Sequence, residues 1–192
     1  ARAINNRAMM YESQEKYELA IEEYSRVINS DYKLSQSNRA MTYSNLADCY
    51  IEMEDYTNAL KDYNSAIDLD KDNPESYDSR ADCYIAMEKY TDALKDYDKA
   101  IDLAPENPNY YNNRADFYRT QENYDEALKD YARAIEISTD DYQTARAINN
   151  RALIYEREEK YELAIEEYTK AIAINSDNPL WYSNRADVYL EE

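Results

Sequence analysis

The chain has 192 residues, of which 44% are hydrophobic and 33% charged, and its apolar runs are too short to cross a membrane. With 41 acidic and 22 basic residues its net charge is −19, so we expect protein or peptide partners with basic segments, and neither nucleic acid nor an anionic membrane. Histidine and glycine are both absent, which removes the usual general base, the commonest metal ligand and any glycine-rich phosphate loop. We therefore predict that the chain is not an enzyme and holds no metal and no cofactor.

The chain begins at Ala1 rather than at a methionine and ends at Glu192 in the middle of a pattern, which favours a fragment of a longer protein. No signal-peptide pattern opens it, although targeting signals that lie outside a fragment would be missing. The compartment therefore stays open, with the cytoplasm favoured.

A pattern of about 34 residues recurs along the chain and predicts pairs of helices. In residues 74–107, numbered as positions 1 to 34, the defining residues are Tyr77 at position 4, Ala81 at 8, Tyr84 at 11, Tyr90 at 17, Ala93 at 20 and Tyr97 at 24. The same numbering predicts a single array over 1–192, with repeats 1–39, 40–73, 74–107, 108–144 and 145–178 and a half repeat or capping helix at 179–192. The first repeat is five residues longer and the fourth three residues longer, and both insertions follow the second helix, around Tyr32–Arg39 and Tyr142–Thr144.

Alanine and tyrosine carry this pattern for physical reasons. Small Ala side chains at positions 8 and 20 let the two helices of a repeat approach closely, and large rings at positions 4, 11, 17 and 24 fill the space between helix pairs. Since 20 of the 23 tyrosines occupy those four positions, we interpret them as framework rather than as an active site. Asn-Pro pairs at Asn73, Asn107 and Asn178 are expected to end one helix pair and start the next.

Positions 8, 11, 15, 17, 20, 24 and 28 are each identical in all five full repeats, and the pattern resembles the tetratricopeptide repeat (TPR) over essentially the whole chain. The resemblance implies an all-α fold, a right-handed α-solenoid of antiparallel helix pairs (TPR superhelix). Two features depart from the family: glycine is replaced by Ala at position 8 and by Glu at position 15, and only Pro105 keeps the proline of position 32. Residues 1–28 and 145–172 also match at 21 of 28 positions, which suggests duplication of a four-repeat block or an engineered copy.

The resemblance also implies that the first helix of each repeat lines a concave, peptide-binding groove. Position 6 faces this groove in the family and is Asn in five of six cases: Asn6, Asn45, Asn113, Asn150 and Asn184. Because an amide can pair with both the N–H and the C=O of an extended peptide, these residues are a candidate ladder for backbone recognition. Position 5 adds Asp78, Asn112 and Asn149 to the candidate site. The alternative reading, in which the amides bond to water or to neighbouring helices, stays open.

Three consecutive repeats carry an aspartate at position 9, one turn after the ladder: Asp48, Asp82 and Asp116. Together with Asp78 and Glu75 they make the middle of the groove acidic, which favours a peptide with Lys or Arg side chains. The alternative is a solvated acidic face, which a chain of this net charge would have in any case.

A carboxylate clamp of the kind found in Hsp-organising co-chaperones is not predicted. The segment Tyr182-Ser183-Asn184-Arg185 resembles its motif, but position 5 is never Lys and position 6 is never Arg. The cations that would pair with a C-terminal carboxylate are therefore missing.

Position 7 is arginine except in the second repeat, where it is Leu46, and position 23 is always Asp or Glu. The arginine row is Arg7, Arg80, Arg114, Arg151 and Arg185. An anion site is one reading, but the co-occurrence of the two rows favours ion pairs that tie the helices of each repeat together.

The two cysteines, Cys49 and Cys83, both occupy position 10 of successive repeats. Equivalent positions on stacked helices lie about 8–10 Å apart, beyond the reach of a disulfide. We expect two reduced and mostly buried thiols.

These observations predict a scaffold for protein–protein interaction that binds an extended, basic peptide segment in its groove. Two alternatives stay open. The segment 179–192 carries Trp181, Tyr182, Ala186 and Tyr189, whose apolar outer face favours end-to-end stacking into a homo-oligomer. The second alternative is that the array is the non-catalytic TPR region of a larger enzyme or signalling protein.

Overall fold

The computed structural model describes residues 2–30 and 33–191, and over these residues it contains helices joined by short connections and no strand. The helices are α1 (Arg2–Glu12), α2 (Tyr17–Ile28), α3 (Gln36–Glu52), α4 (Tyr56–Leu69), α5 (Pro74–Ala86), α6 (Tyr90–Leu103), α7 (Pro108–Thr120), α8 (Tyr124–Ile137), α9 (Asp141–Arg157), α10 (Tyr161–Ile174) and α11 (Pro179–Glu191). The predicted all-α repeat solenoid is confirmed.

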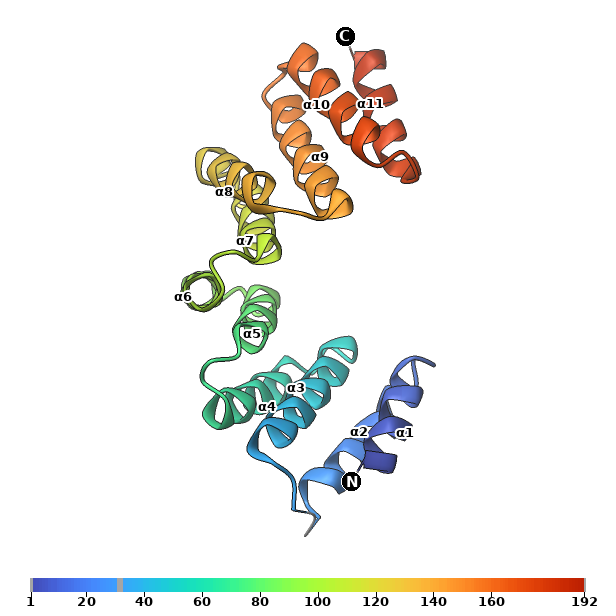
Figure 1. The fold of residues 1–192 in the computed structure, drawn as a ribbon, viewed down its shortest axis with the longest axis vertical. Helices are drawn as coiled ribbons and strands as arrows, with labels where there is room; N and C mark the ends of the chain where they lie inside the picture. Colours follow the sequence, from blue (N-terminus) through green and yellow to red (C-terminus); the bar gives the residue numbers. More distant parts are fainter. Residues whose placement is uncertain (1, 31–32, 192) are drawn as a thin grey trace. The chain divides into compact units, whose positions relative to one another are not determined.

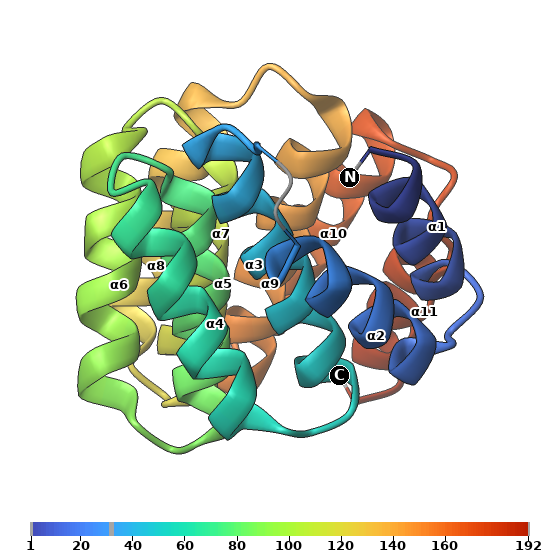
Figure 2. The same ribbon diagram turned by 90° about the horizontal axis from the view of Figure 1, so that it is seen from below.

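The chain forms two compact units, residues 1–103 with α1 to α6 and residues 104–192 with α7 to α11. In the first unit α1 pairs with α2, α3 with α4 and α5 with α6, and contacts of α2 with α3 and of α4 with α5 stack these pairs. In the second unit α7 pairs with α8 and α9 with α10, while α11 packs on α10. Figure 1 and Figure 2 both show α1 beside α2 in the first unit. A single array over 1–192 with the repeat boundaries given above stays a prediction.

The two insertions lengthen the first helix of the repeat that follows them. Helices α3 and α9 have 17 residues each, whereas α5 and α7 have 13. The longer helices begin at side-chain caps, where Ser35 Oγ accepts the N–H of Asn38 at 3.2 Å and Asp140 Oδ1 accepts that of Gln143 at 2.8 Å. Tyr32, in the first predicted insertion, lies outside the described residues.

The Asn-Pro pairs start helices as predicted. Asn73 and Asn107 are the N-cap residues of α5 and α7, with a proline at the first helical position. Their Oδ1 atoms accept the backbone N–H two residues later at 3.1 and 3.0 Å, and Asn178 accepts the N–H of Leu180 at 3.0 Å. Proline lacks the N–H that would otherwise need a partner there, so the pair suits a helix start.

Alanine and tyrosine form the core of every full repeat. The alanines at positions 8 and 20 are completely buried, and the tyrosine at position 24 is at most 2% exposed. The tyrosines at positions 11 and 17 pack against these clusters and are mostly half-buried. The small residues therefore allow close helix contact, and one ring per repeat fills its centre.

A glutamate with a left-handed backbone follows the first helix of every full repeat, with φ between 57° and 58° at Glu15, Glu54, Glu88, Glu122 and Glu159. At Glu88 the backbone N–H donates to the Ile85 C=O at 2.9 Å, and the Lys89 N–H donates to the Tyr84 C=O at 2.8 Å. This pair of bonds is the Schellman motif, which normally places glycine at the left-handed residue. A residue with a Cβ atom adopts that conformation at a cost of about 1–2 kcal/mol.

Replacing Glu88 by glycine should stabilise the protein. Relief of the left-handed backbone outweighs the greater conformational entropy that glycine loses on folding, so we expect the free energy of unfolding to rise by about 0.5–1 kcal/mol. Urea denaturation followed by circular dichroism measures the change. Glu88→Ala is the control, because alanine keeps the Cβ atom, and a glycine variant no more stable than the alanine variant would contradict the prediction.

Candidate functional site

The first helices of the repeats hold carboxylates against buried tyrosines. Tyr63 Oη donates a hydrogen bond of 2.5 Å to Asp48 Oδ1, and burial raises the pKa of this phenol. The same bond joins Tyr97 to Asp82 and, at 2.5 Å, Tyr131 to Asp116. A buried hydroxyl without an acceptor would cost about 1–3 kcal/mol. The position-9 aspartates predicted for the groove therefore also satisfy the core tyrosines.

In the first and fifth repeats a glutamate, rather than an aspartate, accepts the hydrogen bond of the core tyrosine. Position 9 is methionine in the first repeat and leucine in the fifth, and neither side chain can accept the phenol proton. Tyr24 Oη instead donates to Glu12 Oε2 at 2.9 Å, and Tyr168 Oη donates to Glu156 Oε2 at 2.7 Å. These glutamates occupy position 12, one turn further along the first helix. Among the full repeats, position 12 is Glu only where position 9 lacks Asp, and sequence reasoning missed this signal.

In the first unit the predicted asparagine ladder reaches across to the preceding helix pair. Asn45 Nδ2 donates to Tyr24 Oη at 3.3 Å, and Asn6 is exposed. One N–H of the Asn45 amide therefore bonds to a neighbouring helix, as the alternative interpretation of the ladder expects. A role of Asn6 and Asn45 in binding a peptide stays a prediction.

In the second unit the ladder joins a charged cluster around Asp116. Arg146 Nη2 lies 2.6 Å from Asp116 Oδ2 and donates to Asn113 Oδ1 at 3.3 Å. Asn150 Nδ2 donates to Asp116 Oδ1 at 2.7 Å. The cluster links α7 to α9, and the guanidinium of Arg146 compensates the charge of Asp116.

The position-5 residues of the second unit lie deep between helices. Asn112 is 1% exposed and Asn149 is 3% exposed. Asn149 donates to Asn150 and accepts from Asn184 Nδ2, both at 3.2 Å. Within the described residues the amide of Asn112 has no hydrogen-bond partner. Asp78 of the first unit is half-buried and interacts with other residues of the chain. Direct contact of these residues with a peptide stays a prediction.

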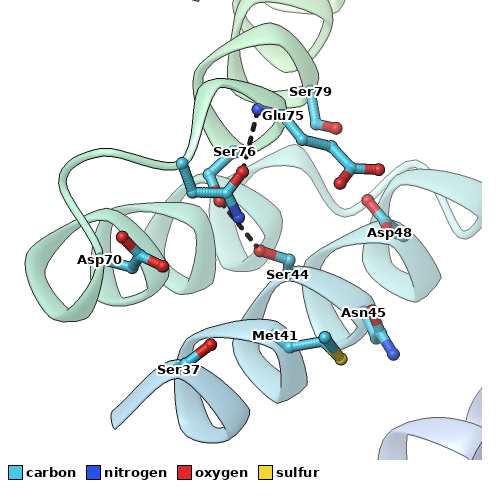
Figure 3. Close-up of a pocket in the computed structure, with 10 residues that line it drawn as sticks. Ser37, Met41, Ser44, Asn45, Asp48, Asp70, Glu75, Ser76 and Ser79 are labelled. Atoms are coloured by element: carbon cyan, nitrogen blue, oxygen red, sulfur yellow. Dashed lines mark hydrogen bonds between the residues drawn. The ribbon is translucent and has the colours of Figure 1, made fainter. Parts of the chain in front are cut away.

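A polar hollow of about 110 Å³ lies along α3 and α5 in the first unit (Figure 3). Its walls combine serine hydroxyls and asparagine amides with three carboxylates, those of Asp48, Asp70 and Glu75. Figure 3 shows the carboxylates of Asp48 and Glu75 pointing toward one another, with Asn45 on the same wall as Asp48. None of the described residues that line this hollow is basic.

The electrostatics of the hollow favour a cation. The pKa of Asp48 is raised to about 6, chiefly by burial and to a lesser extent by the nearby carboxylates Glu12, Glu75 and Glu52, while the hydrogen bond from Tyr63 opposes the rise. Residues 40–103 carry 16 acidic and 6 basic side chains, so a net charge of −10 falls on one third of the chain. A positive group placed here would lower the pKa of Asp48 toward its usual range.

Four arginines of the row form ion pairs inside their repeats, as predicted, whereas Arg185 in the half repeat donates to Thr169 Oγ1. Arg80 Nε and Nη2 donate to the two carboxylate oxygens of Asp96 at 2.7 and 2.8 Å, and both side chains are largely buried. The other pairs are Arg7–Glu23 at 2.5 Å, Arg114–Asp130 at 2.7 Å and Arg151–Glu167 at 2.6 Å. Each pair ties the first helix of a repeat to its second helix, so these arginines are structural.

Substituting Arg80 by alanine should lower stability and leave binding of a groove ligand unchanged. Loss of the bidentate partner strands Asp96 as a buried charge, so we expect the free energy of unfolding to fall by about 3 kcal/mol in chemical denaturation. Arg80→Lys is the control, which keeps the charge and loses the two-point geometry, and it should be intermediate. Lost affinity with unchanged stability would contradict a structural role.

Both cysteines are free and buried, as predicted. Burial raises the pKa of Cys49 to about 12, with smaller contributions from neighbouring carboxylates, and it also raises the pKa of Cys83. Since the thiolate is the reactive form, neither thiol is activated as a nucleophile.

Residues 2–30 and 33–191 contain no group of three or more His, Cys, Asp or Glu side chains arranged to hold a metal ion. In the same residues no helix has the length and apolar character that a membrane crossing requires.

Stacked helix pairs with this recurring pattern define an α-helical repeat protein. The family model described as "Tetratricopeptide repeat" matches residues 1–72 and 106–177, and a second model, "TPR repeat", matches residues 81–121. The chain therefore belongs to the tetratricopeptide repeat family, whose members are generally non-catalytic scaffolds for protein–protein interaction. No curated protein sequence matches it.

Several solved structures share the fold at low sequence identity. A tetratricopeptide repeat protein from Parabacteroides merdae has a TM-score of 0.78 and 19% identity, with 98% of this chain and 72% of that chain covered. TTC0263 of Thermus thermophilus has a TM-score of 0.74 and 14% identity, with 98% of each chain covered. YrrB has a TM-score of 0.66 and 23% identity, with 95% and 90% covered. Identities this low support the fold alone.

Proposed function

We propose that this chain binds an extended, basic segment of a partner protein along the first helices of its first unit, and that it has no catalytic activity of its own. The observation that carries the proposal is the hollow along α3 and α5, where the carboxylates of Asp48 and Glu75 face one another and Asp70 lies on the far side (Figure 3), with no basic residue among the described residues of the wall. An ammonium or guanidinium group of the partner would supply the missing counter-charge.

The same hollow offers groups that suit a peptide backbone. Asn45, Ser44 and Ser79 line it together with the carboxylates, so donors and acceptors for main-chain groups lie beside acceptors for basic side chains. YrrB is described as a TPR protein with an unusual peptide-binding site, which makes peptide binding one use of this fold.

The double substitution Asp70→Asn with Glu75→Gln should weaken binding of a basic peptide. The probe is an acetylated and amidated decapeptide of alternating lysine and serine, titrated calorimetrically at low and at moderate salt. Two exposed charge pairs contribute about 0.2–1 kcal/mol each, so we expect the Kd to rise about fivefold, and less at moderate salt. Asp48 is left in place because it holds Tyr63 in the core.

The matched control is Asp68→Asn with Asp102→Asn, which removes the same charge from exposed positions on α4 and α6 that do not line the hollow. If both double variants bind the peptide equally weakly, the loss of affinity follows from net charge alone, and this result would overturn the site. A wild-type chain that does not bind the peptide would overturn the proposal itself.

Self-assembly is a second candidate, favoured by the outer face of α11. Tyr182, Tyr189 and Leu190 are between 41% and 86% exposed. Trp181 was expected on this face, but the structure corrects that expectation, because Trp181 is 2% exposed and packs in a cluster with Ala145 and Ala171. The apolar face that remains is available to a second copy.

Light scattering after size exclusion tests this candidate. If the α11 face joins two copies, the mass should rise with concentration from the micromolar to the near-millimolar range. Tyr189→Ser with Leu190→Ser should then abolish the rise, while Met41→Ser, at an exposed apolar residue of α3, should not. A monomer over the whole range would exclude the candidate for this chain.

A further inference from the structure

The second repeat lacks the arginine that the other full repeats use to neutralise position 23. Leu46 stands at position 7, and Asp62 stands at position 23 with 7% of its surface exposed. Over the described part of the chain the Asp62 carboxylate takes part in no hydrogen bond and no ion pair, and its neighbour Lys61 forms none with it. Burial raises the pKa of Asp62 to about 6, against a small opposing effect of Lys61. Asp62 is thus a buried carboxylate without an ion-pair partner among the described residues.

The third repeat shows how a guanidinium is held at this place. Besides its two bonds to Asp96, Arg80 donates through Nη1 to Asn64 Oδ1, at position 25 of the preceding repeat, at 2.6 Å. Its guanidinium carbon lies 5.5 Å from the ring centre of Tyr77 and 5.8 Å from that of Tyr84. One carboxylate, one neutral acceptor and two aromatic rings therefore surround the cation.

The second repeat keeps the counterpart of every one of these groups. Asp62 corresponds to Asp96, Ser25 to Asn64, Tyr43 to Tyr77 and Tyr50 to Tyr84. These four residues and Leu46 line a hollow of about 220 Å³ between the helices α2, α3 and α4.

A hydroxyl at position 25 suits the role of the neutral acceptor. In the second unit Arg185, at position 7, donates through Nη1 to Thr169 Oγ1, at position 25, at 3.1 Å. The exposed side chains of Asn58 and Lys61 also line the hollow of the second repeat, so it opens to solvent.

We propose that this hollow, the arginine slot formed by Ser25, Tyr43, Leu46, Tyr50 and Asp62, binds the guanidinium of an arginine side chain presented by a partner protein. A guanidinium matches a carboxylate with two parallel hydrogen bonds and stacks on aromatic faces, whereas an ammonium does neither as well. The slot shares no residue with the hollow along α3 and α5, so it is a separate site on the same unit.

The test is an NMR titration of the ¹⁵N-labelled chain with the peptide acetyl-Gly-Gly-Arg-Gly-Gly-amide. We expect saturable shifts at Ser25, Tyr43, Tyr50 and Asp62, with a Kd of about a millimolar. The same peptide with citrulline, a neutral analogue of similar shape, should bind about tenfold more weakly or not at all. Equal shifts with both peptides would overturn the proposal.

Variants of Asp62 and Leu46 test whether these two residues control binding of the peptide. Asp62→Asn should weaken binding about tenfold, whereas Asp68→Asn, which removes one exposed charge from the same helix, should change it less than twofold. Leu46→Arg should fill the slot from within, abolish the peptide-induced shifts and raise Tm by about 2–4 °C, while Leu46→Met should leave the slot open and binding intact. An Asp62→Asn variant that binds like the wild type would overturn the site even if Leu46→Arg fails to fold.

Two further arms identify the source of the guanidinium and separate this site from the groove. N-acetylarginine, which keeps the guanidinium and carries a carboxylate that no α-ammonium balances, should bind the acidic surface more weakly than the peptide, and tighter binding of N-acetylarginine would overturn the assignment to a partner's side chain. The variant Asp70→Asn with Glu75→Gln should keep the slot shifts. Loss of those shifts in that variant would overturn the independence of the slot.

Discussion

Each full repeat buries a tyrosine hydroxyl between its two helices, and each of these hydroxyls needs an acceptor. In all five repeats the acceptor is a carboxylate from the first helix, at position 9 or one turn later at position 12. Because an unsatisfied phenol in the core would cost about 1–3 kcal/mol, this bond constrains what the first helix can carry on its solvent side. Much of the acidity of the predicted groove therefore has its origin in the core.

The carboxylates that accept these tyrosine hydrogen bonds have different neighbours in the two units. In the second unit Arg146 and Asn150 both bond to Asp116, so the carboxylate that satisfies Tyr131 is neutralised by its neighbours. In the first unit Asp48 satisfies Tyr63, and burial, together with the carboxylates around it, raises the pKa of Asp48. Arg146 thus accounts for the difference between a closed polar cluster at Asp116 and a carboxylate at Asp48 that has no cationic partner among the described residues.

Features set by local chemistry were predictable from the sequence. The Asn-Pro helix starts, the buried alanines and the Arg–carboxylate pairs follow from residue types at fixed spacing, and the structure confirms them. The bond from Tyr63 to Asp48 was not foreseen, because the two residues are 15 apart and meet only through the crossing of two helices. The depth of Asn112 and the burial of Trp181 depend in the same way on how neighbouring helix pairs stack.

The left-handed glutamates show a different limit of sequence reasoning. Glutamate at position 15 reads as a departure from the family, yet the Schellman turn forms in all five repeats with φ near 58°. The two backbone hydrogen bonds and the packing of the following helix hold the turn, so the side chain adapts to it at a cost. Residue preference at a turn therefore predicts stability better than it predicts conformation.

In a repeat protein, the residue that breaks a row is more informative than the row itself. Leu46 interrupts the arginines, and Asp62 remains as a buried carboxylate that forms no ion pair with the residues that the structure describes. A folded-state pKa of about 6, above the ordinary value near 4, means that the ionised group destabilises the fold, fully above pH 6 and not at all well below pH 4. Asp48, in the same repeat, has a pKa raised to a similar value. A ligand that supplies a cation to either carboxylate lowers that pKa and stabilises the folded state by mass action. The second repeat thus combines two uncompensated carboxylates in two separate hollows, and binding of a basic partner there would be coupled to the stability of the first unit.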